Sequence, residues 1–374
     1  MNLGIYIHIP FCKQKCFYCD FYSKSNCSNI EEYIDAVIQE ILSNAELLQS
    51  SNIETIYIGG GTPSLIDEKY ILKILDVLKL LTLDVKEITI EVNPENVTYE
   101  KLRTYFEAGI NRLSIGFQSA NEDTLKKIGR LSTKEHFANT IKLAKEVGFK
   151  NISCDIIIGL CDETITDFEN TIDYILSFKE INHISAYSLE VHENTKLHFL
   201  IENGFVTLPS EDEERNMKYL LDKKLSEKGY IRYEISNYAK PGFESKHNLK
   251  YWNQEEYLGF GTAASSYINS TRYSNISDID TYIINIQLGK SQKEDVQEMD
   301  KLDLMKEYII LRLRLKQGVN FHDFKSRFKM DINDLFKDKI DLLSSQGLLI
   351  ATSENIFLSN KGEDLANIVW QEFI

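Results

Sequence analysis

The sequence predicts an α/β protein in which a partial barrel of six strand–helix units precedes a small, mainly helical C-terminal domain. Three observations support this prediction. Short β-branched runs alternate with helical periodicity in the first half, several strands end in special turn sequences, and helical periodicity alone dominates from about residue 300. With 374 residues, 43% hydrophobic and 26% charged, the composition is that of a globular chain and excludes a disordered one.

Six short runs are predicted to form the strands of the barrel. They are Leu3–His8, Glu54–Ile58, Glu87–Val92, Arg112–Gly116, Ile152–Ile158 and His183–Leu189. We interpret these runs as apolar on both faces, which is typical of a parallel sheet covered by helices. Six such units make a partial barrel that is open on one side, and a doubly wound sheet is the alternative.

Between these runs, apolar residues recur with helical spacing. The clearest case is one face formed by Ile30, Ile34, Val37, Ile41, Ala45 and Leu48. Further helices are predicted at 67–81, 99–108, 133–147 and 164–179. Because each helix follows a strand, the loops at the carboxyl ends of the strands are expected to carry the functional residues.

The second half of the chain has a different organisation. The pattern predicts a charged helix at 211–228, a strand at Ile231–Ile235 and a polar, aromatic stretch from 237 to 267. It then predicts helices at 300–315, 321–328 and 331–345, a hairpin of Leu348–Ala351 and Asn355–Leu358, and a helix at 360–373. Helices followed by a hairpin suggest a winged-helix-like fold. We therefore predict a barrel over 1–235, a connecting region over 236–298 and a C-terminal domain over 299–374.

Charge and hydropathy restrict the partners that the chain can have. Lys and Arg number 42 against 57 Asp and Glu, a formal net charge of −15, which argues against a nucleic-acid partner. No apolar run approaches the roughly 18 residues that span a bilayer. The segment Met1–Pro10 lacks a basic start and a small-residue cleavage site, so we expect no signal peptide and a cytoplasmic protein.

Three of the six cysteines lie close together, directly after the first strand. Cys12, Cys16 and Cys19 form a C-x3-C-x2-C pattern, and three thiolates can hold three irons of a cubane cluster while the fourth iron stays open. Zinc with one further ligand is an alternative, but structural zinc sites usually draw two pairs of ligands from separate loops. A third interpretation is that the three cysteines are incidental. The isolated Cys27, Cys154 and Cys161 are expected to be small core residues.

The segment from Tyr6 to Cys19 resembles the opening of radical S-adenosylmethionine (SAM) proteins. It is most similar to the subfamily that contains oxygen-independent coproporphyrinogen III oxidase and the related radical-SAM heme chaperone. The motifs at 59–64 (GGGTPS), 91–94 (EVNP), 109–119 (GINRLSIGFQS) and 155–160 (DIIIGL) resemble family motifs in the same order. The resemblance implies a [4Fe-4S] cluster on Cys12, Cys16 and Cys19, with SAM on its open iron.

The resemblance also implies which residues contact SAM. They are Tyr6, Tyr18, Gly60, Gly61, Thr62, Glu91, Gln118, Arg130, Asp155 and Leu189. The glycines are expected to let the backbone approach the ligand. Three polar residues, Glu91, Gln118 and Asp155, are expected to meet a hydroxyl, amine or sulfonium group at the mouths of their strands.

Two departures from the oxidase pattern favour the heme chaperone group. Phe21 stands where the oxidase has a further cysteine, and little chain precedes Cys12. The segment His247-Asn-Leu-Lys-Tyr-Trp252 resembles the H-N-x-x-Y-W signature of the chaperone group, which makes His247 the expected axial heme ligand and Tyr251 and Trp252 candidates to pack on the porphyrin. Cys161 stands where the family usually has proline, which leaves the shape of that loop open.

The sequence therefore predicts a radical-SAM-type protein that binds heme and transfers it to an acceptor protein. No residue is assigned a catalytic role. The expected partners are heme, an acceptor, an electron donor such as a flavodoxin or ferredoxin, and a membrane only transiently, if the acceptor is membrane-bound. The alternatives are radical oxidative decarboxylation of coproporphyrinogen III propionates and a zinc-stabilised interaction protein.

Overall fold

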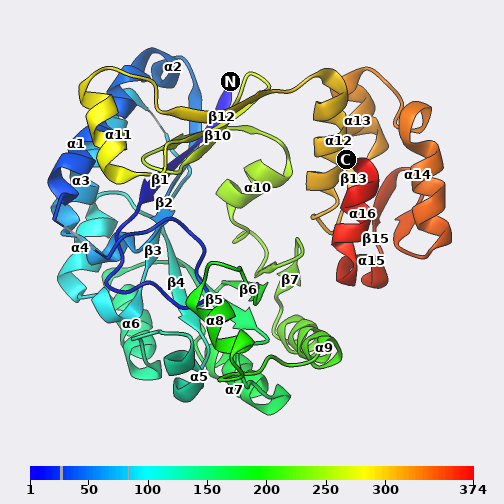
Figure 1. Ribbon diagram of the computed structural model, residues 1–374, viewed down its shortest axis with the longest axis horizontal. Helices are drawn as coiled ribbons and strands as arrows, with labels where there is room; N and C mark the ends of the chain where they lie inside the picture. The colour runs from blue at the N-terminus through cyan, green and yellow to red at the C-terminus, as the bar shows by residue number, and fades with distance from the viewer. Residues whose placement is uncertain (26–27, 83) are drawn as a thin grey trace.

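The computed structural model describes residues 1–25, 28–82 and 84–374. In this part of the chain, one twelve-stranded sheet has the order β12-β11-β10-β9-β1-β2-β3-β4-β5-β6-β8-β7, and a three-stranded sheet has the order β13-β15-β14. Figure 1 shows the large sheet curved, with helices on its outer side and the C-terminal domain beside it. No helix of the described residues is long and apolar enough to cross a membrane.

Six parallel strands in sequence order form the partial barrel, as the sequence predicted. They are β1 (Asn2–Ile9), β2 (Asn52–Gly60), β3 (Glu87–Val92), β4 (Arg112–Gln118), β5 (Asn151–Ile158) and β6 (His183–Ser188). Each pairs in parallel with the next. All six carboxyl ends consequently meet at one mouth of the barrel.

The helices between these strands cover the outer face. They are α1 (Ile30–Ser43), α2 (Ala45–Gln49), α3 (Glu68–Leu81), α4 (Tyr99–Glu107), α5 (Glu122–Lys127), α6 (Lys134–Val147) and α7 (Ile165–Leu176), with 3-10 turns η1 (Pro63–Leu65) and η2 (Pro94–Asn96). The single helix predicted over 30–48 is broken at Asn44. The Asn44 side chain donates to the Glu40 carbonyl at 2.8 Å and so competes with the helical backbone.

The interpretation that the barrel strands are apolar on both faces is wrong. Outward-facing residues such as Ile5 and Ile90 are fully buried in the core beneath the helices. Polar side chains of the opposite face bond one another across strands, as Ser114 does with Asp155. Polar and apolar residues therefore alternate along each strand. The apolar residues point outward and pack against the helices, and the polar residues point into the interior of the open barrel.

Residues 231–298 extend this same sheet at both edges. Strand β8 (Asn237–Ala239) pairs antiparallel with β6 and with the short β7 (Ile231–Arg232), so the strand predicted over Ile231–Ile235 has only two residues. At the other edge β9 (Glu256–Phe260) pairs parallel with β1, and β10 (Ser265–Ile268), β11 (Thr271–Asn275) and β12 (Lys293–Glu298) follow antiparallel. The helices α8 (Lys196–Glu202) and α9 (Glu211–Glu227) precede this region, and α10 (Lys246–Trp252) and α11 (Ile279–Gln287) lie within it.

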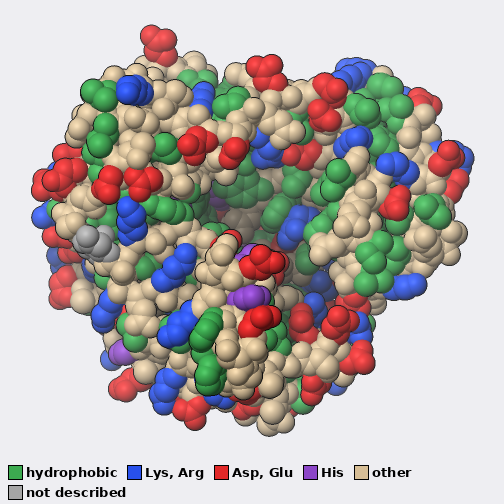
Figure 2. All heavy atoms as spheres, viewed as in Figure 1, with side chains coloured by type: hydrophobic (Ala, Val, Ile, Leu, Met, Phe, Trp, Pro, Cys, Tyr) green, Lys and Arg blue, Asp and Glu red, His purple; other side chains and the backbone are tan. Residues whose placement is uncertain are grey.

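The C-terminal domain has its own hydrophobic core. Its elements are α12 (Lys301–Arg312), β13 (Val319–Asn320), α13 (Phe321–Phe328), α14 (Asn333–Ser345), β14 (Leu349–Ala351), β15 (Asn355–Leu358), α15 (Asn360–Asp364) and α16 (Ala366–Phe373). The predicted hairpin is present, and the final helix predicted over 360–373 is interrupted at Leu365. Figure 2 shows a hollow at the centre of the molecular face, bounded on one side by this domain.

Candidate functional site

The three clustered cysteines lie on a closed loop at the mouth of the barrel, directly after β1. The amide of Cys12 donates to the Lys24 carbonyl at 3.0 Å, and the amide of Lys24 donates to the Pro10 carbonyl at 2.7 Å. Within the loop, the Cys19 amide donates to the Cys16 carbonyl at 3.2 Å. These bonds fix the backbone, so that the three thiols lie partly exposed on one short loop.

The surroundings of the thiols fit an iron–sulfur cluster. Burial raises the pKa of the Cys12 thiol and raises that of Cys19 to about 11, so the thiolates need a positive partner, which bound iron supplies. Thr62 Oγ1 lies 3.6 Å from Cys12 Sγ and Arg130 Nη1 lies 3.7 Å from Cys16 Sγ. Hydrogen bonds to sulfur tune clusters of this kind.

A zinc ion and a cubane make different demands on the three thiols. A single zinc ion needs every thiolate within about 2.3 Å of one point, and structural zinc sites usually have four protein ligands. A cubane instead presents a separate iron to each thiolate, so the three cysteines of one loop supply a ligand set for three of its irons. Among residues 1–25, 28–82 and 84–374, no three His, Cys, Asp or Glu side chains are gathered around one point.

Arg130 lies between the cysteine loop and the ends of the strands. Besides Cys16 Sγ, its guanidinium donates from Nη2 to the Gly116 carbonyl at 2.8 Å and to Asn93 Oδ1 at 3.4 Å. Its buried Nε has no hydrogen-bond partner. This arrangement leaves one N–H of a fixed cation available beside the cluster loop.

The glycines at the end of β2, Gly60 and Gly61, are required first by the packing of the protein itself. A Cβ on Gly61 would lie 2.8 Å from the Phe11 carbonyl oxygen, and one on Gly60, whose φ is +109°, would lie 2.6 Å from the His8 ring. These glycines therefore let the strand end pack against the cysteine loop, in addition to the predicted approach of a ligand. The amide of Gly60 donates to Glu91 Oε2 at 3.1 Å.

Two partly buried carboxyl groups, those of Glu91 and Asp155, interact across the mouth of the barrel. Glu91 accepts from Tyr57 Oη at 2.9 Å, and Asp155 accepts from Ser114 Oγ at 3.1 Å. Burial, together with the negative charge of Asp155, raises the pKa of Glu91 to about 7, and burial also raises that of Asp155. Such a pair offers acceptors for the cationic and hydroxyl groups of a ligand.

The other residues assigned to SAM also lie near this mouth. Gln118, the last residue of β4, has a positive φ of 72°. Tyr6 packs against the Tyr57 ring at 6.1 Å. Tyr18 and Leu189 pack against a small hydrophobic cluster beside the cysteine loop. Apart from His247, the predicted cofactor residues lie at strand ends or in loops of this mouth, except that Tyr6 and Asp155 lie within β1 and β5.

His247 lies inside the barrel, beneath the mouth. It is 1% exposed, its Nδ1 lies 2.8 Å from Thr55 Oγ1, and its Nε2 lies 2.8 Å from Tyr251 Oη. Its ring stacks on Tyr57 at 5.2 Å. Burial, with the charges of Lys250 and Arg112, lowers the His247 pKa to about 3. The imidazole is therefore neutral, but both of its nitrogens are engaged.

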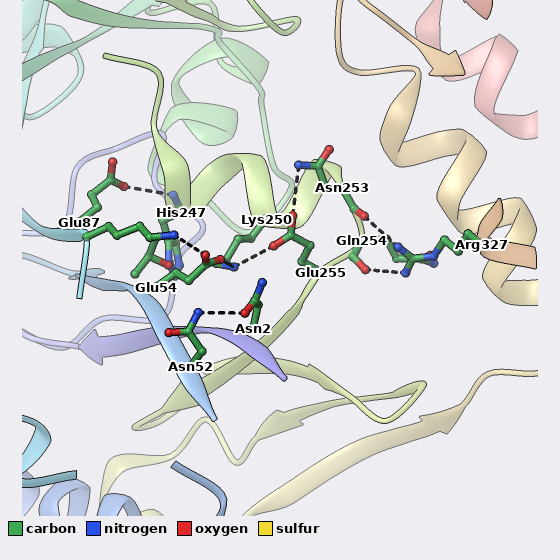
Figure 3. A network of polar contacts seen from close by, with 12 residues as sticks. Asn2, Asn52, Glu54, Glu87, His247, Lys250, Asn253, Gln254, Glu255 and Arg327 are labelled. Carbon is green, nitrogen blue, oxygen red and sulfur yellow. Dashed lines mark hydrogen bonds and ion pairs between the residues drawn. The ribbon is translucent and has the colours of Figure 1, made fainter. Parts of the chain in front are cut away.

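Helix α10, which carries His247, is fixed at both ends (Figure 3). At its start, Glu87 accepts from the backbone amide of His247 at 3.1 Å. The buried Lys250 Nζ lies 2.6 Å from Glu54 Oε2. At its end, Arg327 of the C-terminal domain donates to the Gln254 carbonyl at 2.9 Å. The helix thus connects the barrel interior to the C-terminal domain.

Several residues of the site were not identified from the sequence. Tyr57 bonds Glu91 and stacks on His247, and Asn93 accepts from Arg130. Asn93 lies inside the recognised motif at 91–94, so its position was a signal. Tyr57 is an aromatic residue within a predicted strand, and nothing in the sequence distinguishes it from other such residues. Cys154 and Cys161 are fully buried, as expected for core residues. The expectation for Cys27 falls outside the described residues.

Comparison with known proteins agrees with this geometry. A model of the radical SAM superfamily matches residues 6–175, and a model of the HemN C-terminal domain matches residues 299–365. The chain is 35% identical over 373 residues to the heme chaperone HemW of Bacillus subtilis, with 99% of this chain and 98% of that protein covered. It is 29% identical over 379 residues to the heme chaperone HemW of Escherichia coli, with 100% and 98% covered.

A solved structure supports the fold. The coproporphyrinogen III oxidase HemN from Escherichia coli, described as a radical SAM enzyme, superposes with a TM-score of 0.87 at 21% identity, covering 100% of this chain and 90% of that chain. At this identity the likeness shows the fold alone. The full-length similarity to several HemW proteins shows the family: the chain belongs to the radical SAM superfamily and, within it, to the family of the proteins named heme chaperone HemW.

Proposed function

We propose that this protein is a heme chaperone of the radical-SAM type, which binds heme and transfers it to an acceptor protein. The observation that carries the proposal is the 35% identity to the Bacillus subtilis heme chaperone HemW over nearly the whole of both chains. Phe21, where the oxidase group has a further cysteine, supports the same choice.

In this proposal Cys12, Cys16 and Cys19 hold a [4Fe-4S] cluster. The bound cluster and SAM supply one-electron chemistry, which the protein positions and shields. Thr62 and Arg130 donate toward the sulfur atoms.

The mouth of the barrel offers a complementary surface for SAM. Glu91 and Asp155 provide acceptors for its positive groups, and Tyr57 and the Gly60 amide hold the Glu91 carboxylate in place. Tyr6, Tyr18, Gly61, Gln118 and Leu189 complete the surface.

We further propose His247 as the heme contact. A neutral imidazole is the form that binds iron, and the lowered pKa keeps His247 neutral. Because Nε2 is bonded to Tyr251 and the ring is buried, heme ligation requires this bond to open and α10 to shift.

Partners and location follow from the same proposal. Heme and a heme-acceptor protein are the cargo and its destination, and a flavodoxin or ferredoxin is the expected type of electron donor. We place the protein in the cytoplasm, where reducing conditions keep the three thiols free for iron, with a membrane contacted only when an acceptor resides there.

The test is a hemin titration of the anaerobically reconstituted protein, followed by the Soret band, for the wild type, His247→Ala and His322→Ala. His322 is a matched control because its side chain is 90% exposed. We expect saturable, stoichiometric binding whose spectrum shifts only in His247→Ala. Non-saturating curves in all three proteins would refute the heme chaperone. Conversion of coproporphyrinogen III to protoporphyrinogen IX under reducing, anaerobic conditions would establish the decarboxylase instead.

A further inference from the structure

Both tryptophans of the chain lie beside the same arginine. The sequence has 2 Trp; Trp252 ends α10 and Trp370 lies in α16, far apart in sequence. The guanidinium carbon of Arg314 lies 4.3 Å from the ring centre of Trp252 and 5.2 Å from that of Trp370. We call these three residues the Trp–Arg–Trp cluster. It joins the helix of His247 to the C-terminal domain.

The cluster presents donors without partners. Within the part of the chain that the structure describes, Trp252 Nε1, Arg314 Nε and Trp370 Nε1 are buried atoms without a hydrogen-bond partner. Indole and guanidinium nitrogens donate and do not accept. A buried donor is destabilising when unpaired, so a group that accepts from this cluster is stabilised there. Because Arg314 is a cation, an anionic acceptor complements the cluster best.

The position of Arg314 is fixed, and it borders the barrel mouth. Its carbonyl accepts from the Ile235 amide at 3.1 Å, which holds the backbone against the barrel edge. Its guanidinium lies within electrostatic reach of Glu234, and of Tyr187 and Glu190 at the end of β6. Figure 2 shows Lys or Arg side chains and hydrophobic side chains together on the wall of the central hollow nearest the C-terminal domain.

The carboxylate of Glu234 does not satisfy the cluster. Glu234 is fully buried, and its Oε1 accepts from the Ser236 amide and from the Asn237 side chain. Its Oε2 has no hydrogen-bond partner, and it forms no ion pair with Arg314 within the described residues. Among the described residues, the Nε of Arg314 therefore has no acceptor, although the charge of Glu234 acts on the guanidinium.

We propose that the Trp–Arg–Trp cluster is a subsite for a carboxylate of the porphyrin cargo. This inference rests on the proposed function and deepens it, since heme carries two propionates on a flat apolar ring. Arg314 pairs with one propionate, the indole N–H groups of Trp252 and Trp370 donate to it, and their rings extend the apolar wall for the macrocycle. The cluster thus contributes binding and orientation at a point separate from iron ligation by His247.

The test compares hemin with hemin dimethyl ester, in which both propionates lack charge. We expect Arg314→Met to weaken hemin binding about tenfold or more, the size of a charge-assisted hydrogen bond. The same variant should leave the affinity for the diester unchanged, and Arg314→Lys should recover part of the loss for hemin. Trp370→Phe, which keeps a ring and removes the N–H, should weaken hemin binding less.

Lys337→Met is the matched control, because it removes one positive charge from an exposed site of the same domain; it should bind like the wild type. Circular dichroism and thermal unfolding verify that each variant is folded. Two results would refute the subsite when the wild type binds hemin. In one, Arg314→Met binds hemin as tightly as the wild type; in the other, it loses affinity for hemin and for the diester alike. Arg314 would then serve to compensate the charge of Glu234. If wild-type protein does not bind hemin saturably, the proposed function fails and the subsite fails with it.

Discussion

At the scale of single residues, the candidate site is defined by two carboxyl groups whose charges are only partly compensated. Glu91 and Asp155 are partly buried, and both have a raised pKa. A cationic ligand such as SAM would balance their charge, whereas a neutral ligand would not. In the proposed function, these two groups therefore favour a positively charged ligand.

The pKa of Glu91 predicts how SAM binding depends on pH. Because this pKa is raised to about 7, the carboxyl is protonated below that pH and accepts hydrogen bonds poorly. We expect SAM affinity, measured by equilibrium dialysis of the reconstituted protein, to fall as the pH drops from 8 to 6, by up to about tenfold per pH unit.

The variant Glu91→Gln gives the matching control for this prediction. Its amide cannot ionise, so binding should be weak at every pH and nearly independent of pH. A pH profile of Glu91→Gln that parallels the wild-type profile would show that another group controls binding.

His247 shows where residue-level prediction from sequence reaches its limit. Its motif predicted an axial heme ligand, which stays a prediction, and the residue types alone gave no sign that the side chain is buried. Burial and the bonds to Thr55 and Tyr251 arise from strands and a helix that are distant in sequence. The cysteines, by contrast, were recognisable because all three ligands lie on one loop.

At the scale of elements, the cysteine loop is held by the end of β2. The amides of Gly61 and Thr62 donate to the carbonyls of Ile9 and Phe11 at 2.9 and 2.8 Å. Because Gly61 is pressed against backbone atoms of Ile9 and Phe11, a side chain at this position displaces the loop. The geometry of the cluster loop depends on this contact.

Gly61→Ala is therefore expected to impair cluster loading without unfolding the protein. The added Cβ would lie within 2.9 Å of Phe11 and Ile9 backbone atoms, so the loop must shift. Iron content after anaerobic reconstitution should fall several-fold, while circular dichroism remains that of the wild type. Gly229→Ala is the control, since its Cβ meets nothing within 4 Å and only its positive φ is strained, by roughly 1–2 kcal/mol. Equal iron content in Gly61→Ala and wild type would contradict this prediction.

The elements themselves were largely predictable, and the exceptions have physical reasons. The periodic spacing of apolar residues identified the six strand–helix units, because the outward-facing residues of each strand and the inward-facing residues of each helix form one hydrophobic core. The short strands β8 and β13 pair with strands far along the chain, β7 has only two residues, and all three carry little local pattern. Helix α10 has only seven residues and is held by tertiary contacts such as that with Glu87, so its sequence alone did not indicate a helix.

At the scale of the whole molecule, α10 connects two hydrophobic cores. The barrel and the C-terminal domain have separate cores, and Arg327 and Arg312 reach from the domain to the end of α10. Glu234 and Leu315 form a further backbone bridge between the two parts. Events in the C-terminal domain can therefore be transmitted to His247 through this helix.

This coupling predicts how the protein unfolds. Both tryptophans lie at the junction, one in α10 and one in α16, so tryptophan fluorescence reports on the junction, while far-ultraviolet circular dichroism reports on the whole fold. In the wild type we expect the two signals to change together in a urea titration. In Arg327→Ala, which loses the bonds to the Asn253 and Gln254 carbonyls, the fluorescence transition should come at lower urea than the circular dichroism transition.

The control is Lys325→Ala. Lys325 lies on the same helix, α13, but contacts Asp331 rather than α10, so this variant shows whether weakening α13 in general separates the two transitions. Its two transitions should still coincide. Coincident transitions in Arg327→Ala as well would mean that the two cores unfold together without this contact, and that the remaining bridge at Glu234 and Leu315 suffices. Separated transitions would mean that α10 carries the coupling, so that release of the C-terminal domain is a physical route by which His247 becomes accessible to heme.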